Sequence, residues 1–277
     1  MKIHPRSTLA LIVVSSLAIA QQHGQGIQSI SGYDEAIEDN SFLIEEAYNQ
    51  EPGVVQHISN ATYFPTPQKN LVYTFTQEWP VFSQAHQFSF TIPYEFLNGN
   101  TINGPGDILL NYRYQLFESN DWAAVSPRIS FILPTGSENK GLGMGAFGVQ
   151  VNLPVSKRIS NDLVGHFNAG FTVLPDAGSP GGGATATLSS FSIGASAIWL
   201  ATYHLNFMIE ALANSGKEFD EMGGTVRTTE YILNPGVRYA IDIGSLQIVP
   251  GVSLPVAFSE GDSQTGWFFY LSFEHPF

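Results

Sequence analysis

The chain has 277 residues, a formal net charge of −13 and no cysteine, and 13% of its residues are charged, against about 25% in an average soluble domain. The lack of cysteine excludes disulfide bonds and thiolate metal sites, and the acidic charge argues against nucleic acid as a partner. One large domain or two smaller ones fit this length.

The first twenty residues have the three parts of a secretory signal peptide. Lys2 and Arg6 give a basic start, residues 9–17 are apolar, and small residues precede Gln21. The apolar run is shorter than the roughly 20 residues that cross a bilayer as a helix, which argues against a membrane anchor. We therefore predict that residues 1–20 are a signal peptide cleaved before Gln21, which shifts the formal net charge to −15.

Residues 21–52 form a separate acidic segment, which contains seven Asp or Glu residues and no Lys or Arg. Within it, the stretch SFLIEEAYN at 41–49 predicts a short helix, with Ser41 as the N-cap and two glutamates in the early turns. Pro52 then follows as a helix breaker.

From residue 53 onward, segments of about ten residues alternate apolar and polar side chains, which is the period of a strand with two different faces. No stretch after the signal peptide is long and apolar enough for a membrane helix, so a chain that crosses a bilayer must cross it as strands. The alternation is clearest at 85–94, 107–117 and 146–156. The predicted strands are 54–63, 70–78, 85–94, 107–117, 122–134, 146–156, 162–173, 189–200, 203–213, 228–240, 245–257 and 266–277.

Short and long connections alternate between these strands, as they do in outer-membrane barrels, which have short periplasmic turns and longer external loops. The short connections are 118–121, 157–161, 201–202 and 241–244, and the longer ones are 95–106, 135–145, 174–188, 214–227 and 258–265. A soluble β-sandwich has no reason for this rhythm. We therefore predict an all-β fold, a transmembrane antiparallel up-and-down β-barrel of about 12 strands over residues 53–277, in the bacterial outer membrane.

Aromatic residues lie near many predicted strand ends, where their amphipathic rings suit the lipid headgroup zone. They include Trp79, Trp122, Trp199, Tyr203, Tyr239 and Trp267. On the last strand, Trp267, Phe269, Leu271, Phe273 and the terminal Phe277 share one face, which resembles the C-terminal targeting pattern of outer-membrane barrels. The expected partners are therefore outer-membrane lipid and, through the strand ending at Phe277, the barrel-assembly machinery.

The run SFLIEEAYNQEPGVVQHI at residues 41–58 resembles the N-terminal motif of the outer-membrane transporters grouped with the phenol-degradation (MetA-pathway) β-barrel family. Beyond this run the resemblance is one of strand number and pattern. It implies transport across the outer membrane, with small aromatic or other apolar compounds as solutes.

If the apolar faces contact lipid, strand alternation places seven ionisable side chains in the lumen. A charge on the lipid face near the bilayer midplane would cost roughly 2–4 kcal/mol. The seven are Arg113, Arg128, His166, Glu210, Glu230, Arg238 and Glu274. As a pore lining they would form a constriction that selects solutes by charge. In the alternative, the acids and bases pair with one another and hold a narrow barrel shut.

Two placements stay open for the acidic segment. Residues 27–52 either fold into the lumen as a plug that meets Arg113, Arg128 and Arg238, or form a polar tail on the periplasmic side.

Other functional classes have weaker support in the sequence than a channel does. A lipid hydrolase of the outer wall would need a nucleophile and a base, and His57 and Ser59 share a strand face, but no third group orients the histidine. The loop acids Glu218, Asp220 and Glu221 are interpreted as solvated rather than as a calcium site. We predict no enzymatic activity, no cofactor and no metal, and a channel for passive passage of a small solute, with a closed structural or adhesive barrel as the alternative.

Overall fold

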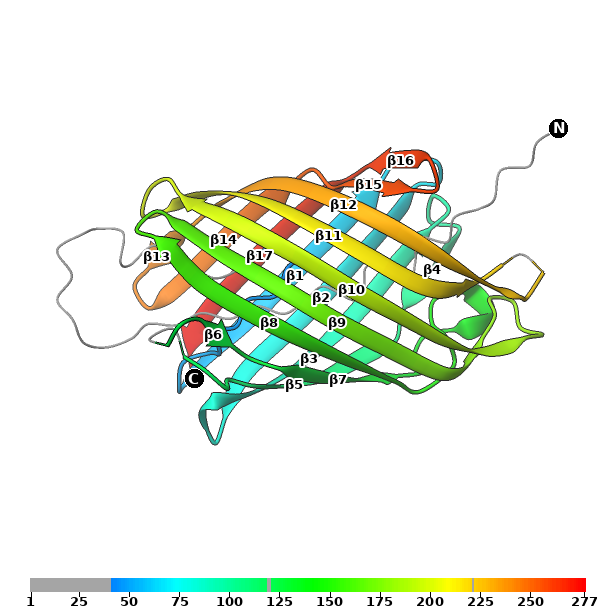
Figure 1. The fold of residues 1–277 in the computed structure, drawn as a ribbon, viewed down its shortest axis with the longest axis horizontal. Coiled ribbons are helices and arrows are strands. Elements are labelled where there is room, and N and C mark those ends of the chain that lie inside the picture. The colour runs from blue at the N-terminus through cyan, green and yellow to red at the C-terminus, as the bar shows by residue number, and fades with distance from the viewer. Residues whose placement is uncertain (1–40, 119–120, 221) are drawn as a thin grey trace.

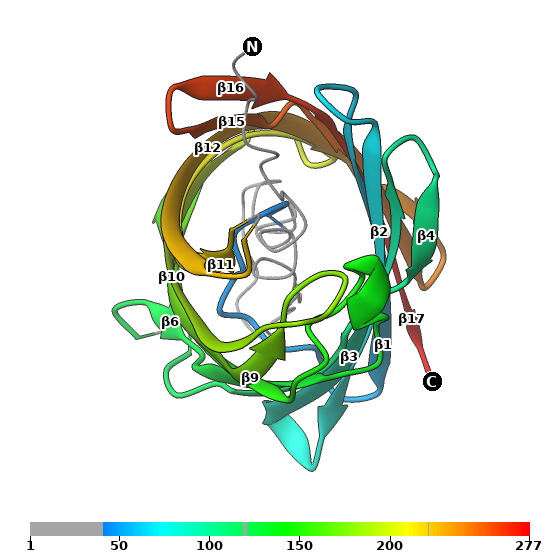
Figure 2. The same ribbon diagram turned by 90° about the vertical axis from the view of Figure 1, so that its right-hand side faces the viewer.

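A computed structural model describes residues 41–118, 121–220 and 222–277. In these ranges, twelve long strands pair antiparallel with their neighbours in the chain, and the last pairs with the first to close a barrel (Figures 1 and 2). The predicted signal peptide and cleavage site lie outside the described residues. Within the described residues, no helix is both long and apolar enough to cross a membrane.

Every predicted strand segment carries one of the wall strands, which confirms the fold class. The wall strands are β1 (Val54–Phe64), β2 (Asn70–Val81), β3 (Ser83–Leu97), β5 (Ile108–Tyr114), β7 (Arg128–Leu133), β8 (Gly148–Ser160), β9 (Leu163–Gly178), β10 (Thr185–Leu200), β11 (Leu205–Phe219), β12 (Thr225–Tyr239), β14 (Leu246–Ser253) and β17 (Trp267–Pro276). The connections hold the short strands β4 (Ile102–Pro105), β6 (Ala124–Val125), β13 (Ile241–Ile243), β15 (Val256–Ser259) and β16 (Asp262–Thr265), and a 3₁₀ turn (Glu138–Lys140).

Several predicted boundaries are wrong, including that of the predicted strand 245–257, which is divided between β14 and β15. The regions 174–188 and 214–227, predicted as loops, are mostly strand, because β9 and β11 continue into hairpins with β10 and β12. The backbone ladder persists there, but the clear alternation of apolar and polar residues does not. The predicted strand 122–134 is divided between β6 and β7.

The distribution of side chains is inverted relative to a soluble protein. Large apolar side chains on most wall strands are exposed on the outside, among them Phe131, Phe171, Ile209 and Phe269. Alternate residues on the same strands point inward and are polar and buried. A contiguous apolar exterior over a polar interior is what a barrel in a lipid bilayer requires.

Two apolar clusters lie inside the wall, towards its opposite ends. One joins Phe42 to wall residues including Ile198, Leu200 and Met208, towards the end with the short connections. The other joins Leu109, Ile132, Leu174 and Leu188 near the end with the longer loops. The polar middle of the lumen lies between them.

Candidate functional site

All seven side chains predicted to line the lumen are buried and on inward-facing positions. Arg113 lies on β5, Arg128 on β7, His166 on β9, Glu210 on β11, Glu230 and Arg238 on β12, and Glu274 on β17, and none is more than 9% exposed. The barrel therefore brings them to one interior. A role for them in solute passage stays a prediction.

Residues 41–50, which we call the luminal segment, run through this interior. In Figure 2 the blue start of the described chain lies inside the ring of strands. All of these residues except Leu43 are buried. Of the two placements considered for the acidic segment, these ten residues adopt the one inside the barrel.

The segment does not form the predicted helix, because side chains of the barrel wall accept hydrogen bonds from its backbone N–H groups. Glu45 N–H donates to Asn168 Oδ1 (2.8 Å), Ala47 N–H to Ser156 Oγ (2.7 Å), and Gln50 N–H to the side-chain oxygen of Gln87 (2.8 Å). In a helix these groups would bond to carbonyls four residues earlier. Buried backbone donors need partners, and here the barrel wall supplies them.

Glu210 clamps the start of the segment. Its Oε1 accepts the consecutive N–H groups of Phe42, Leu43 and Ile44 at 3.0, 2.8 and 3.0 Å, and its Oε2 accepts from Asn234 Nδ2 at 2.7 Å. Hydrogen bonds to a carboxylate are about twice as strong as those between neutral groups. A glutamate predicted to face a solute thus holds the chain's own backbone.

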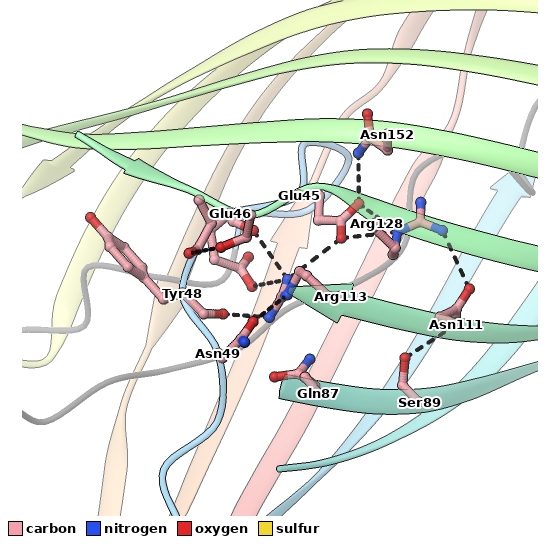
Figure 3. Close-up of polar contacts among 12 residues, drawn as sticks. Glu45, Glu46, Tyr48, Asn49, Gln87, Ser89, Asn111, Arg113, Arg128 and Asn152 are labelled. Atoms are coloured by element: carbon pink, nitrogen blue, oxygen red, sulfur yellow. Dashed lines mark hydrogen bonds and ion pairs between the residues drawn. The ribbon is translucent and has the colours of Figure 1, made fainter. Parts of the chain in front are cut away.

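Glu45 is the centre of the ionic contacts (Figure 3). Its carboxylate accepts from Arg128 Nε at 3.0 and 2.9 Å and from Asn152 Nδ2 at 2.6 Å, and it lies 3.5 Å from Arg113 Nη1. These arginine and glutamate side chains are at most 3% exposed. Buried charges need such pairing, since an unpaired one is strongly destabilising.

Arg113 contacts the second half of the luminal segment. It donates to Asn49 Oδ1 (2.8 Å), to the carbonyl of Glu46 (3.1 Å) and to the carbonyl of Tyr48, and it lies 3.5 Å from the Glu46 carboxylate. Both arginines therefore have ion-pair partners in the luminal segment. Contact with Arg238, the third arginine proposed for the acidic segment, stays a prediction, because residues 27–40 of that segment lie outside the described residues.

The ring of Phe42 packs between two aromatic rings and two glycine positions of the barrel wall. Its ring lies 5.3 Å from the rings of Phe268 and Tyr270, between centroids. A Cβ atom at Gly236 or Gly251 would come within 2.6 or 2.5 Å of the Phe42 ring, closer than real contacts allow. The missing side chains at these two positions create the space that the ring fills.

At the end with the longer loops, Asp107 fixes the loop 136–144. Its two carboxylate oxygens accept N–H groups from Gly136 and Met144, each at 2.9 Å. Burial raises the pKa of Asp107, and the backbone N–H donors, including that of Met144, partly offset this shift. Met144 thereby packs against the second apolar cluster.

Replacing Asp107 by alanine is expected to release this loop, because the partly buried N–H groups of Gly136 and Met144 lose their acceptor. Lys140 is exposed within the loop, so trypsin should cut the folded variant after Lys140 at least several times faster than the parent chain. Asp262→Ala, which removes an exposed carboxylate from another hairpin at the same end, is the control. Equal cutting rates in all three proteins would refute the anchoring role of Asp107.

Sequence reasoning missed Asp107, Phe42 and its glycines, Asn152 and Asn168. Phe42 lies in the run 41–58, whose family resemblance was the only sequence signal that could have identified it. The other residues have no such signal, because an isolated Asn, Asp or Gly in a strand or loop forms no recognisable pattern.

The remaining candidates have other contacts. Ser59 Oγ lies 3.0 Å from Tyr73 Oη, and His57 Nε2 lies 3.3 Å from His275 Nε2, so Ser59 and His57 contact different residues. In the loop 220–224, Asp220 accepts the N–H groups of Met222 and Gly224. No group of three or more His, Cys, Asp or Glu side chains suited to a metal ion occurs in the described ranges.

No family model matches the sequence, and no curated protein matches it. Among solved structures, an outer-membrane channel from Pseudomonas putida F1 is similar with a TM-score of 0.59 and 12% identity, over 84% of this chain and 98% of that one. The NanC porin is similar with a TM-score of 0.52 and 12% identity, over 80% of this chain and 100% of that one. At such identities the likeness concerns the fold, and it does not show the phenol-degradation family suggested by residues 41–58. The chain has the fold of the outer-membrane channel barrels.

Proposed function

We propose that this protein is an outer-membrane channel for the passive passage of small solutes, and that the luminal segment holds it closed. The observation that carries the proposal is the pairing of Glu45 inside the lumen with Arg113 and Arg128 on the neighbouring wall strands β5 and β7. A wall that only needed to be rigid could pair its own charges. Here the wall binds a segment of chain that precedes the first strand, and such a segment can leave without breaking the barrel.

The finer solute class is also a proposal. The resemblance of residues 41–58 suggests small aromatic or other apolar compounds, and the buried apolar residues near the longer loops support that class. Leu109, Ile132 and Leu188 line the inner wall there, where an apolar solute would lose contact with water first. Such a solute must then pass the charged middle of the lumen, which is the layer that the luminal segment occupies.

A closed structural barrel is the second candidate, favoured by the number of buried bonds that hold the segment. Single-channel conductance of the refolded mature protein in a planar bilayer distinguishes the two. We expect small or rare currents from the mature chain and steady currents after removal of residues 21–52. A folded, truncated barrel that conducts no current would favour the structural candidate. On the conducting form, benzyl alcohol is expected to block the current for longer than glycerol does, and equal blocking would argue against the apolar solute class.

A further inference from the structure

His57 on β1 and His275 on β17 face each other on the outer wall, at the seam where the first and last strands close the barrel. The strand register sets His57 opposite Phe273 and His275 opposite Val55, so the two histidines are diagonal neighbours on one face. Their Nε2 atoms are 3.3 Å apart, and their rings are inclined by 21° with centroids 5.3 Å apart. The two Nε2 corners are therefore much closer to each other than the ring centres are.

The hydrogen bonding of His275 leaves its Nε2 free to bind. Its Nδ1 lies 2.8 Å from the carbonyl oxygen of Pro276, and because a carbonyl only accepts, Nδ1 carries the proton. The neutral ring then has its lone pair on Nε2, which points to His57. Histidines that bind metals usually donate their other N–H in this way, which fixes the tautomer and the ring orientation.

The ring of His57 is also held in place. It stacks on Phe273 with centroids 4.8 Å apart and lies 6.2 Å from Phe75, with interplanar angles of 25° and 27°. Both phenyl rings come from the neighbouring strands β17 and β2. Little conformational freedom is left to lose when a ligand binds.

We propose that His57 and His275 together bind one divalent transition-metal ion, of which Zn²⁺ is the simplest probe, with water in the remaining coordination positions. Zn–N bonds of about 2.0–2.1 Å in tetrahedral geometry separate the two nitrogens by about 3.3–3.4 Å, which matches the observed distance. A direct N–H···N hydrogen bond would favour a shorter separation, near about 3.0 Å. The bound ion links β1 to β17, so it stabilises the closed barrel against opening at this seam. The site is independent of solute passage through the lumen.

Isothermal titration calorimetry of the tag-free mature protein with Zn²⁺ tests the site. We expect one ion per chain, and affinity at least tenfold weaker in His57→Asn and in His275→Asn. The double variant should bind Zn²⁺ about as weakly as either single variant, because each single variant has already lost the chelation that needs both imidazoles. His86→Asn is the matched control, since His86 is another outward-facing histidine, and its Nδ1 lies 2.6 Å from Tyr112 Oη.

A second measurement is independent of calorimetry. Zn²⁺ should raise the unfolding temperature of the parent protein and of His86→Asn, and leave those of the two seam variants unchanged. Circular dichroism verifies that each variant is folded, and either seam variant alone suffices for the comparison. The proposal is wrong if the parent chain binds no Zn²⁺, or if all variants bind it with the same affinity.

Discussion

Replacing Glu45 by alanine is expected to release the luminal segment and convert rare currents into steady conductance. The substitution leaves Arg128 without its carboxylate partner, and it leaves Arg113 with the Glu46 carboxylate at 3.5 Å. Removing one partner of a buried ion pair typically costs about 3–5 kcal/mol. Because about 1.4 kcal/mol changes an equilibrium tenfold, the docked state should lose at least a hundredfold in relative population. Single-channel recording in a planar bilayer measures the change as open probability.

A double-mutant cycle shows whether the effect comes from the pair itself. Arg128→Ala alone should also open the channel, since it leaves Glu45 buried with one weaker partner. If the two groups act through each other, Glu45→Ala combined with Arg128→Ala should have an effect clearly smaller than the sum of the single effects. Glu51→Ala, which changes an acidic residue just outside the luminal segment, is the control. Closed behaviour in the Glu45 variant would mean that other contacts, such as those of Phe42 and Glu210, suffice to hold the segment.

The wall strands could be predicted because lipid and lumen impose opposite demands on alternate residues. In β5, Leu110 and Tyr112 face outward while Asn111 and Arg113 are buried inside, and the sequence displays that contrast directly. Beyond the bilayer both faces of a hairpin meet water, so the contrast fades although the backbone pairing continues. This is why the predicted strands end at residues 173 and 213, although β9 and β11 continue to Gly178 and Phe219.

The contacts of the site could not be predicted, because they join residues that only barrel closure brings together. Glu45 lies 68 positions before Arg113 and 83 before Arg128, and no spacing rule connects them. The helix predicted at 41–49 failed for a related reason. Local propensity favoured it, but Glu210, Asn168 and Ser156 offer the backbone other acceptors that only the folded wall provides.

Replacing Phe90 by arginine is expected to prevent membrane assembly of most of the protein. Phe90 is the central residue of β3 and faces outward, where it lies opposite Gln77 on β2 and Leu110 on β5. It also contacts the ring of Trp79, at 5.7 Å between centroids. An arginine on the lipid face near the midplane costs about 2–4 kcal/mol, and the lost aromatic contact adds to this. The folded yield in liposomes, measured after refolding, should fall severalfold or more.

The control is an arginine substitution on the inner face of the barrel, at a position chosen from the structure. Strand alternation alone suggests Asn111→Arg, but Asn111 Oδ1 accepts a hydrogen bond from Arg128 at 3.3 Å, so a new guanidinium there would be repelled. Asn214 is the better choice, because it faces inward on β11 and lies opposite Glu230 on β12. An arginine at Asn214 gains a carboxylate partner, whereas an arginine at Phe90 faces lipid and lies opposite Gln77 and Leu110, neither of which is a carboxylate. Equal folded yields for Phe90→Arg and Asn214→Arg would contradict the assignment of the outer face to lipid.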